Sequence, residues 1–279
     1  LWFVMSIFSK IYFEKRSNKF AEEMVQMIYH SILFIVSLSS VLFFLNLNHK
    51  FPSKFVLVFA NILTFLAILS KYAIRKKIHA YLNDTFEYIK GGEKITYYNN
   101  SPNTLTEAYF NLYQNAFNKN SLTNDLYKTN KTKVSHGQYE SQNKGIEITS
   151  FTINNEPVDF EIYNTILKIK LPKPLLPGEK IDFNIDFITY FDRGSIRRRM
   201  KVFDHHGVKH FNGVHWYPRI CVYDRKFTWE TSQHLEKEFY GDFGTFDVKL
   251  NLPQKYIVEA TGLLINREEA LPDDLRKAI

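Results

Sequence analysis

The 279-residue sequence contains a single cysteine, Cys221, and none of the short motifs that mark common catalytic sites. One cysteine excludes an intrachain disulfide, and its place within I-C-V is typical of a small buried hydrophobic residue. The sequence has no H-E-x-x-H zinc motif and no G-x-S-x-G nucleophile turn, and Gly91-Gly92 alone is no phosphate-binding loop. We therefore expect no self-sufficient active site, and no metal ion or other cofactor, in this chain.

An excess of positive charge outside the first segment is also lacking. The formal net charge is +7, and residues 1–78, with ten Lys or Arg and three Glu, account for all of it. The other 201 residues carry 26 basic and 26 acidic side chains. A nucleic-acid-binding domain needs its basic excess on the binding surface itself. The charge distribution therefore predicts no nucleic-acid partner.

The N-terminal segment has the composition of a membrane region. Between Met24 and Asn48 there is no Lys, Arg, Asp or Glu, and a helix rising about 1.5 Å per residue spans a bilayer core of about 30 Å over such a length. A second apolar run follows Pro52, and Lys71 within it can snorkel to the interface. We predict two transmembrane helices, 24–48 and 55–74, within a membrane region 1–78; the alternative for the first is a buried helix of a soluble protein.

The side of the membrane that the rest of the chain occupies is open at this point. Basic residues precede the first predicted span, and the triplet 75–77 follows the second. The positive-inside rule then favours a cytoplasmic location for both ends. Lys50 and Lys54, in the connection between the spans, weaken that argument.

After Lys77 the pattern changes to alternating, aromatic-rich segments. The clearest is 181–187, where Ile and Phe alternate with Asp and Asn, so that one face is apolar and the other polar. Gly91-Gly92 reads as a hairpin turn, 114–145 as a long surface loop, and L-P-K-P-L-L-P-G-E as a segment that cannot lie in a sheet centre. The chain is predicted to be mainly β, with an antiparallel β-sandwich over 79–279. Other expected strands are 81–89, 93–98, 105–113, 146–153, 158–163 and 165–171.

Two polar clusters invite functional interpretations. His205, His206, His210, His215 and His234 suggest a metal site, but zinc ligands recur at recognisable spacings that this Gly-punctuated region lacks. The basic run 193–201 suggests an anion site. Because surface charges pair weakly and locally in most proteins, we favour pairing of this run with neighbouring acids such as Asp192 and Asp204.

One stretch is distinctive enough to suggest a family. The segments H-W-Y-P-R-I-C-V-Y-D-R-K-F, E-F-Y-G-D-F-G-T-F-D-V and P-Q-K-Y-I-V-E-A-T-G, with L-P-D-D-L-R after them, resemble the N-terminal domain of bacterial gluzincin metallopeptidases of the aminopeptidase N type. Earlier segments agree in the same order: I-T-Y-Y-N-N-S-P-N-T-L, L-Y-Q-N-A-F and L-P-K-P-L-L-P-G-E. The resemblance covers roughly 79–279.

The resemblance implies a saddle-like β-domain followed by a separate catalytic domain. That domain would carry the zinc ligands, would begin beyond Ile279, and would hydrolyse peptides from a free amino terminus. This chain would supply a scaffold and, at most, one wall of the cleft, at the W-Y-P-R turn. The alternative is that Trp216 and Tyr217 belong to the core and that Arg219 and Asp224 form a structural pair. The substrate-cleft candidates are His215, Trp216, Tyr217, Arg219, Tyr223 and Asp224.

Two functions remain at this stage. The first is the non-catalytic scaffold of a membrane-tethered zinc aminopeptidase, with the membrane, its own catalytic domain and a peptide substrate as partners. The second is a membrane-displayed β-sandwich binding module without enzymatic activity. Relatives of the first kind are usually exported, so the resemblance favours an extracytoplasmic β-domain.

Overall fold

The computed structural model describes residues 74–195, 200–235, 240–242, 244–272 and 276. One compact unit spans Tyr72–Pro253, and the described residues after Pro253, with the short helix α6 (Arg267–Ala270), belong to a second unit. No helix within the described ranges is long and apolar enough to cross a membrane. The predicted spans 24–48 and 55–74 lie outside the described residues, apart from Ile74.

The first described residues form a strand and not the end of a membrane helix. β1 (Ile74–Asn83) starts ahead of the boundary expected at residue 79 and contains the basic triplet 75–77. Its burial alternates, with Lys76 and Ile78 buried and their neighbours exposed. Period-two burial is the pattern of a strand with one face on a core. The triplet is therefore part of the β-domain.

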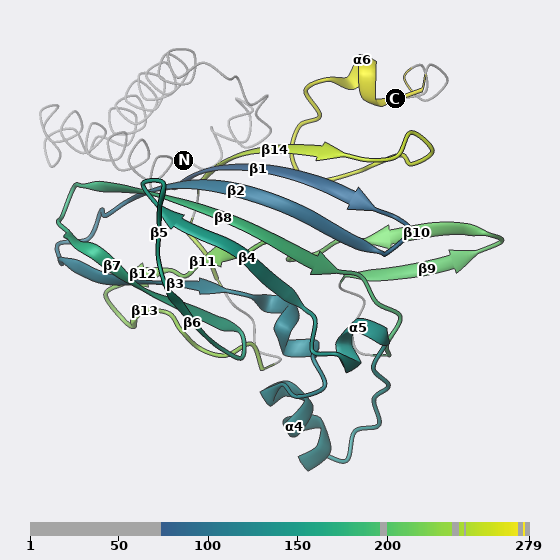
Figure 1. Cartoon of the computed structure of the whole chain (residues 1–279), viewed down its shortest axis with the longest axis horizontal. Helices are drawn as coiled ribbons and strands as arrows, with labels where there is room; N and C mark the ends of the chain where they lie inside the picture. Colours follow the sequence, from purple (N-terminus) through teal and green to yellow (C-terminus); the bar gives the residue numbers. More distant parts are fainter. Residues whose placement is uncertain (1–73, 196–199, 236–239, 243, 273–275, 277–279) are drawn as a thin grey trace, which may run out of the picture. The chain divides into compact units, whose positions relative to one another are not determined.

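Two sheets make up most of this unit (Figure 1). The larger has the strand order β14-β1-β2-β8-β4-β5. Its neighbouring strands are antiparallel except β1 and β14, which run parallel. Its strands besides β1 are β2 (Tyr88–Tyr98), β4 (Ile146–Ile153), β5 (Glu156–Pro157), β8 (Lys180–Tyr190) and β14 (Thr245–Asn251).

The smaller sheet is antiparallel throughout and has the order β11-β3-β7-β6. Two short ribbons accompany the sheets, β9 paired with β10 and β12 paired with β13. The strands of the smaller sheet are β3 (Leu105–Asn111), β6 (Phe160–Tyr163), β7 (Ile166–Leu175) and β11 (Arg219–Ile220). Those of the ribbons are β9 (Lys201–His205), β10 (Val208–Asn212), β12 (Tyr223–Asp224) and β13 (Thr228–Trp229).

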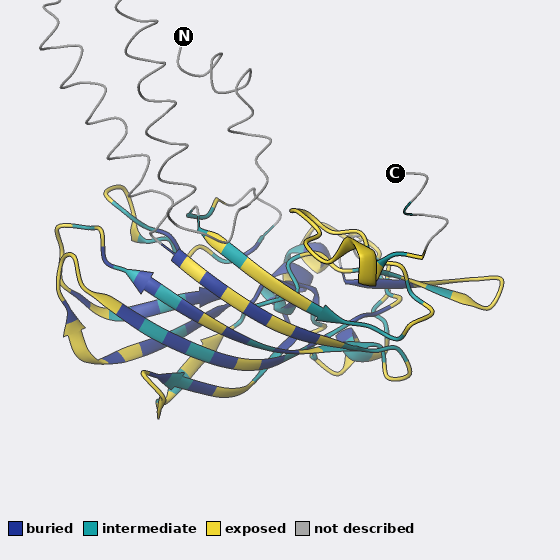
Figure 2. Cartoon of the chain, turned by 90° about the horizontal axis from the view of Figure 1, so that it is seen from above, coloured by how far each residue is buried: buried dark blue, intermediate teal, exposed yellow. Residues whose placement is uncertain are grey.

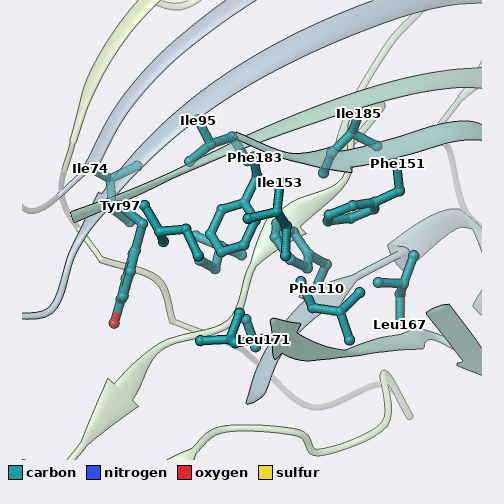
Figure 3. Packing of buried hydrophobic residues seen from close by; sticks show 14 of the residues in the cluster. Ile74, Ile95, Tyr97, Phe110, Phe151, Ile153, Leu167, Leu171, Phe183 and Ile185 are labelled. Carbon is teal, nitrogen blue, oxygen red and sulfur yellow. The ribbon is translucent and has the colours of Figure 1, made fainter. Parts of the chain in front are cut away.

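The two sheets bury their apolar faces against each other (Figure 3). Phe110 of β3 packs edge-to-face against Phe151 of β4 and Phe183 of β8, in both cases with ring centroids 5.3 Å apart. Burial of apolar surface stabilises by about 25 cal/mol per Å², and edge-to-face rings add to it. The expected mainly β fold with antiparallel sheets is confirmed.

The alternation predicted for 181–187 is confirmed in β8. Ile181, Phe183, Ile185 and Phe187 are buried, whereas the Asp and Asn residues between them are not. β8 pairs with β2 on one side and β4 on the other, so it lies inside the larger sheet. Figure 2 shows the same alternation of buried and exposed residues along the strands of this sheet.

The prediction of a turn at Gly91-Gly92 was wrong. The turn joining β1 and β2 lies at 84–87, and both glycines lie within β2. A Cβ on Gly91 would stand 2.5 Å from Cζ of Phe187 in the neighbouring strand β8. Glycine is required here for close packing, which a strand interior uses when a neighbour approaches the backbone.

The prediction that 114–145 is a long surface loop was also wrong. This segment contains a 3₁₀ helix, η1 (Tyr113–Phe117), and the helices α4 (Leu122–Thr129) and α5 (Gln138–Ser141). Ser121 caps α4, because its hydroxyl accepts a hydrogen bond from the backbone N–H of Asn124. The Asn, Ser and Thr content that suggested a loop therefore also serves helix capping.

The proline-rich segment extends a strand, but Pro172 and Pro174 stay outside its ladder. β7 continues through Pro172 and Pro174 to Leu175. The register with β3 passes from Lys170 to Leu175, and β6 pairs only with residues 166–169. The prolines thus occupy the part of β7 where no donor is needed, as expected.

Replacing Gly91 with Ala should destabilise the fold through the ring of Phe187. The added methyl overpacks the sheet, so we expect a loss of about 1–3 kcal/mol in the free energy of unfolding, measured by chemical denaturation. Gly213→Ala is the matched control, because the nearest atoms to its Cβ lie 3.8 Å away. Equal stability of the two variants would contradict the packing explanation.

Candidate functional site

The W-Y-P-R turn is held by side chains from three separate elements. Gln114 of η1 donates a hydrogen bond to the carbonyl of Val214 at 2.7 Å, and Thr189 of β8 donates to that of Trp216 at 2.6 Å. Lys76 of β1 donates to the carbonyl of Pro218 at 2.9 Å. An unpaired buried carbonyl is costly, so each donor stabilises one conformation of the turn.

The chain leaving the turn is fixed to the edge of the smaller sheet. Arg219 and Ile220, as β11, pair with Asn111 and Phe110 of β3. The backbone N–H of Cys221 donates to the carbonyl of Tyr109 at 2.8 Å. Cys221 is buried, and burial raises the pKa of its thiol above the ordinary value. It is a packed thiol and not an activated nucleophile, as the sequence predicts.

The aromatic residues of the turn have packing roles. Trp216 packs against Phe187 with ring centroids 6.2 Å apart, and against Tyr217 at 5.2 Å with nearly perpendicular rings. Both residues are partly buried and pack against the main core. Burial raises the pKa of Tyr217. This placement agrees with the core alternative for Trp216 and Tyr217, while each keeps a solvent-exposed part.

A buried ion pair lies beneath the turn. The ammonium of Lys76 in β1 lies 2.8 Å from Oε2 of Glu93 in β2, and the side chains are 1% and 0% exposed. The ammonium also lies 4.5 Å from the ring centroid of Tyr217, within cation–π distance. Oε1 of Glu93 has no hydrogen-bond partner in the described part of the chain.

Burial shifts the protonation of both members of the pair. It raises the pKa of Glu93 to about 7, against the opposing charge of Lys76. Burial likewise lowers the pKa of Lys76, and Glu93 counteracts this. Because neither side chain reaches solvent, the pair cannot act on a substrate directly. The pair instead positions Pro218 and Tyr217, because the Lys76 ammonium contacts the carbonyl of one and the ring of the other.

Arg219 packs over Gly241, a glycine of the segment E-F-Y-G-D-F-G. A Cβ on Gly241 would lie 1.6 Å from Nη2 of Arg219, so the guanidinium occupies the space above the glycine. Burial raises the pKa of the neighbouring Asp242, while the charge of Arg219 opposes that rise. The G-D of E-F-Y-G-D-F-G is thereby brought to the W-Y-P-R turn.

Tyr223 and Asp224 have structural contacts both within the β12–β13 ribbon and with residues outside it. The Tyr223 hydroxyl accepts a hydrogen bond from Nδ2 of Asn103, and its ring packs against Trp229. Oδ1 of Asp224 accepts the backbone N–H groups of Lys226 and Phe227 at 2.8 Å each. Oδ2 of Asp224 accepts the hydroxyl of Tyr240, which lowers the pKa of the carboxyl. The structure thus divides the six candidates between a turn and a separate ribbon.

The histidines do not assemble into a metal site within the described ranges. His215, in the left-handed region at φ 54°, packs its ring against Tyr113 at 5.0 Å, and the buried His234 packs against the same tyrosine at 5.5 Å. His205 and His206 lie at the β9–β10 turn. In the described part of the chain no three His, Cys, Asp or Glu side chains are grouped to hold a metal.

The described part of the basic run pairs with acidic side chains. Arg193 forms ion pairs with Glu87 and with Asp204, the latter at 2.7 Å. Lys201 pairs with Glu140 in the interior. Asp192 instead accepts backbone N–H groups of Glu140 and Arg193. The pairing with Asp204 that the sequence predicted is present; residues 197–199 lie outside the described residues.

Lys76 and Glu93 are the residues that sequence reasoning missed. If I-R-K-K-I-H-A is taken as a strand, its period of two puts Lys76 on the same face as Ile74 and Ile78 and predicts its burial. This prediction was missed because the triplet 75–77 was interpreted as the flank of a membrane helix. Glu93 shares its face of β2 with Ile95, which only the correct placement of Gly91-Gly92 within the strand makes visible.

Comparisons with solved structures find M1 zinc metallopeptidases and a leukotriene A4 hydrolase among the similar chains. No family model matches the sequence, and no curated protein does. The chain is similar to M1 zinc metallopeptidase from Deinococcus radiodurans, solved as a mutant bound to a Tyr-Ser-Ala substrate, with 13% identity and a TM-score of 0.40 over 70% of this chain and 37% of that one. A second structure of M1 zinc metallopeptidase from that organism has 14% identity and a TM-score of 0.38, over 69% of this chain and 35% of that one. Leukotriene A4 hydrolase from Saccharomyces cerevisiae has 11% identity and a TM-score of 0.27, over 42% of this chain and 15% of that one.

The chain thus spans little more than a third of the length of the bacterial enzymes. Likeness at these TM-scores and identities establishes neither a shared activity nor a shared site. The family remains a hypothesis that rests on the sequence motifs.

The ion pair beneath the turn should show strong coupling in a double-mutant cycle. Lys76→Met leaves Glu93 buried without its partner, so we expect a loss of about 3–5 kcal/mol in the free energy of unfolding. Glu93→Leu should cost a similar amount. The double variant should be more stable than either single variant, because two apolar side chains replace both charges. Additive losses would contradict direct coupling of the two side chains.

Proposed function

We propose that residues 74–279 are the non-catalytic N-terminal scaffold domain of a membrane-tethered zinc metallopeptidase that acts on peptides as an aminopeptidase. The catalytic domain with its zinc ligands would follow in the same full-length protein. The observation that carries the proposal is the resemblance of the segments H-W-Y-P-R-I-C-V-Y-D-R-K-F and E-F-Y-G-D-F-G-T-F-D-V to that class of domain. The chain itself contains no H-E-x-x-H.

Contacts within the chain bring these two segments together into one surface. Arg219 of the first packs over Gly241 of the second, and Tyr217 of the first lies near Phe246 of the second, with ring centroids 6.4 Å apart. The hydrogen bonds to the carbonyls of Val214, Trp216 and Pro218 then hold this surface in one geometry. A surface held in this way is suited to form a wall for a peptide, since preorganisation reduces the cost of binding. Within it, Tyr217 and Arg219 are our candidates for contact with substrate.

The test is the reading frame beyond Ile279 and the activity of the longer protein. We expect H-E-x-x-H within roughly the next two hundred residues, the scale of one further domain. The longer protein should hydrolyse aminoacyl-arylamides in a chelator-sensitive reaction, and the 279-residue chain should not. A stop codon directly after Ile279 would leave the membrane-displayed binding module as the function. Chelator-sensitive turnover by the 279-residue chain would also contradict the proposal.

Arginine variants of the longer enzyme separate a cleft wall from a scaffold without substrate contact. Arg219→Ala should lower kcat/KM by roughly tenfold if the guanidinium contacts the peptide. Arg225→Ala is the matched control, because Arg225 is exposed in the β12–β13 ribbon. Equal kcat/KM for both variants, at equal folded fractions, would remove Arg219 from the cleft.

The β-domain is proposed to face the extracytoplasmic side. Export is usual for the class that the chain resembles, and β1 gives the triplet 75–77 a structural purpose: Lys76 is buried against Glu93. The basic triplet therefore has an explanation other than a cytoplasmic location of the domain.

Single-cysteine labelling tests the sidedness. Val208 is 67% exposed in β10, and Cys221 is buried. A membrane-impermeant maleimide should therefore label Val208→Cys in intact spheroplasts, while the unsubstituted chain should stay unlabelled. Labelling only after the membrane is permeabilised would place the domain in the cytoplasm.

A further inference from the structure

The two sheets differ in how their edges are protected. The larger sheet ends on one side in β5, which has two residues, one of them Pro157. The smaller sheet ends in β11, a two-residue strand preceded by Pro218, and in the four-residue β6. Short strands and prolines are two of the usual means of preventing further strand pairing.

β14 lacks these protections. It is the other end strand of the larger sheet, pairs with β1 over seven residues and contains no proline. Most of the strand is exposed (Figure 2). Val248 at its centre is 44% exposed. Asp247 and Lys249 form no ion pair within the described part of the chain, although Lys77 is the register partner of Asp247. A long exposed edge strand is a template for pairing with another strand.

The sequence of β14 is complementary to itself when read in reverse. In T-F-D-V-K-L-N, an antiparallel pair centred on Val248 sets Asp247 opposite Lys249 and Phe246 opposite Leu250. Thr245 then lies opposite Asn251. Opposite charges and apolar residues directly across an antiparallel pair are stabilising. We propose that β14 pairs antiparallel with β14 of a second copy of this chain, about a two-fold axis at Val248.

The faces of the strand agree with this pairing. The register partners of Phe246, Val248 and Leu250 are Lys76, Ile78 and Ala80, which lie on the buried face of β1. The two-fold pairing therefore continues that apolar face from one copy into the other. On the opposite face, Lys77 lies beside Asp247 of the same copy, and Asp247 lies beside Lys249 of the second copy. The charges therefore alternate across the strands. The interface is isologous and closes at two copies, since each edge is used once.

A cysteine at the two-fold axis gives a direct test. In Val248→Cys the two thiols would lie opposite each other, because directly paired residues have Cα atoms about 4.5–5.5 Å apart, within disulfide range. We expect a disulfide-linked dimer of the full chain after mild oxidation. Val208→Cys is the matched control, as an exposed valine outside β14, and should remain monomeric on non-reducing gels.

Charge exchange then tests the register. Asp247→Lys sets like charges opposite each other twice and should weaken self-association of the full chain by about tenfold, measured as protein mass against concentration in one detergent. The double variant Asp247→Lys/Lys249→Asp restores two opposite-charge pairs and should recover the dimer. A monomeric wild-type chain at all concentrations, equal cross-linking of Val208→Cys and Val248→Cys, or failure of the double variant to recover would each overturn the proposal.

Discussion

The contact between Lys76 and Glu93 connects more of this molecule than any other polar interaction described above. It joins the two neighbouring strands β1 and β2 on their buried face, and the same ammonium reaches the carbonyl of Pro218 and the ring of Tyr217. A buried pair of this kind is costly to desolvate, so its contribution to stability is not its main consequence. In the arrangement observed here, the two strands and the turn together give the ammonium a carboxylate, a carbonyl and an aromatic ring.

The apolar core and the polar turn therefore have separate physical tasks. Phe110, Phe151 and Phe183 hold the two sheets together through non-directional burial. The donors Gln114, Thr189 and Lys76 then select the conformation of the W-Y-P-R turn through directional bonds. A surface formed in this way can keep its shape without a ligand, which is the property needed of a cleft wall or of a docking surface.

Pairing of β14 between two copies and the scaffold function both involve Phe246 but are compatible, because the pairing uses the backbone of β14 and the turn contacts the ring of Phe246. The pairing uses the outer edge and the centre of β14, around Val248. The turn meets the inner face at the start of that strand, where Phe246 lies near Tyr217. A dimer would therefore place two such turns in one assembly, related by the two-fold axis. This arrangement follows from the position of β14 at the end of its sheet.

Much of the fold could be predicted from the sequence because one local rule governs it. Alternation in 181–187 predicted the burial of β8, since the side chains of a strand point to opposite faces in turn. Proline chemistry likewise predicted that 172–174 would remain outside a ladder. The lone cysteine in an apolar context predicted its own burial.

Other features depended on neighbours that are distant in the chain. Gly91 has the local signature of a turn, and only the ring of Phe187 from another strand explains its place within β2. Lys76 has the local signature of a membrane flank, and only Glu93 and the turn at Pro218 make its burial tolerable. The sequence by itself thus determined which residues could face a core, through periodicity. The tertiary structure decided which charges and glycines that core would accept. A buried charge is tolerated only beside a partner, and a glycine is required only where a neighbouring side chain fills the space of its missing Cβ.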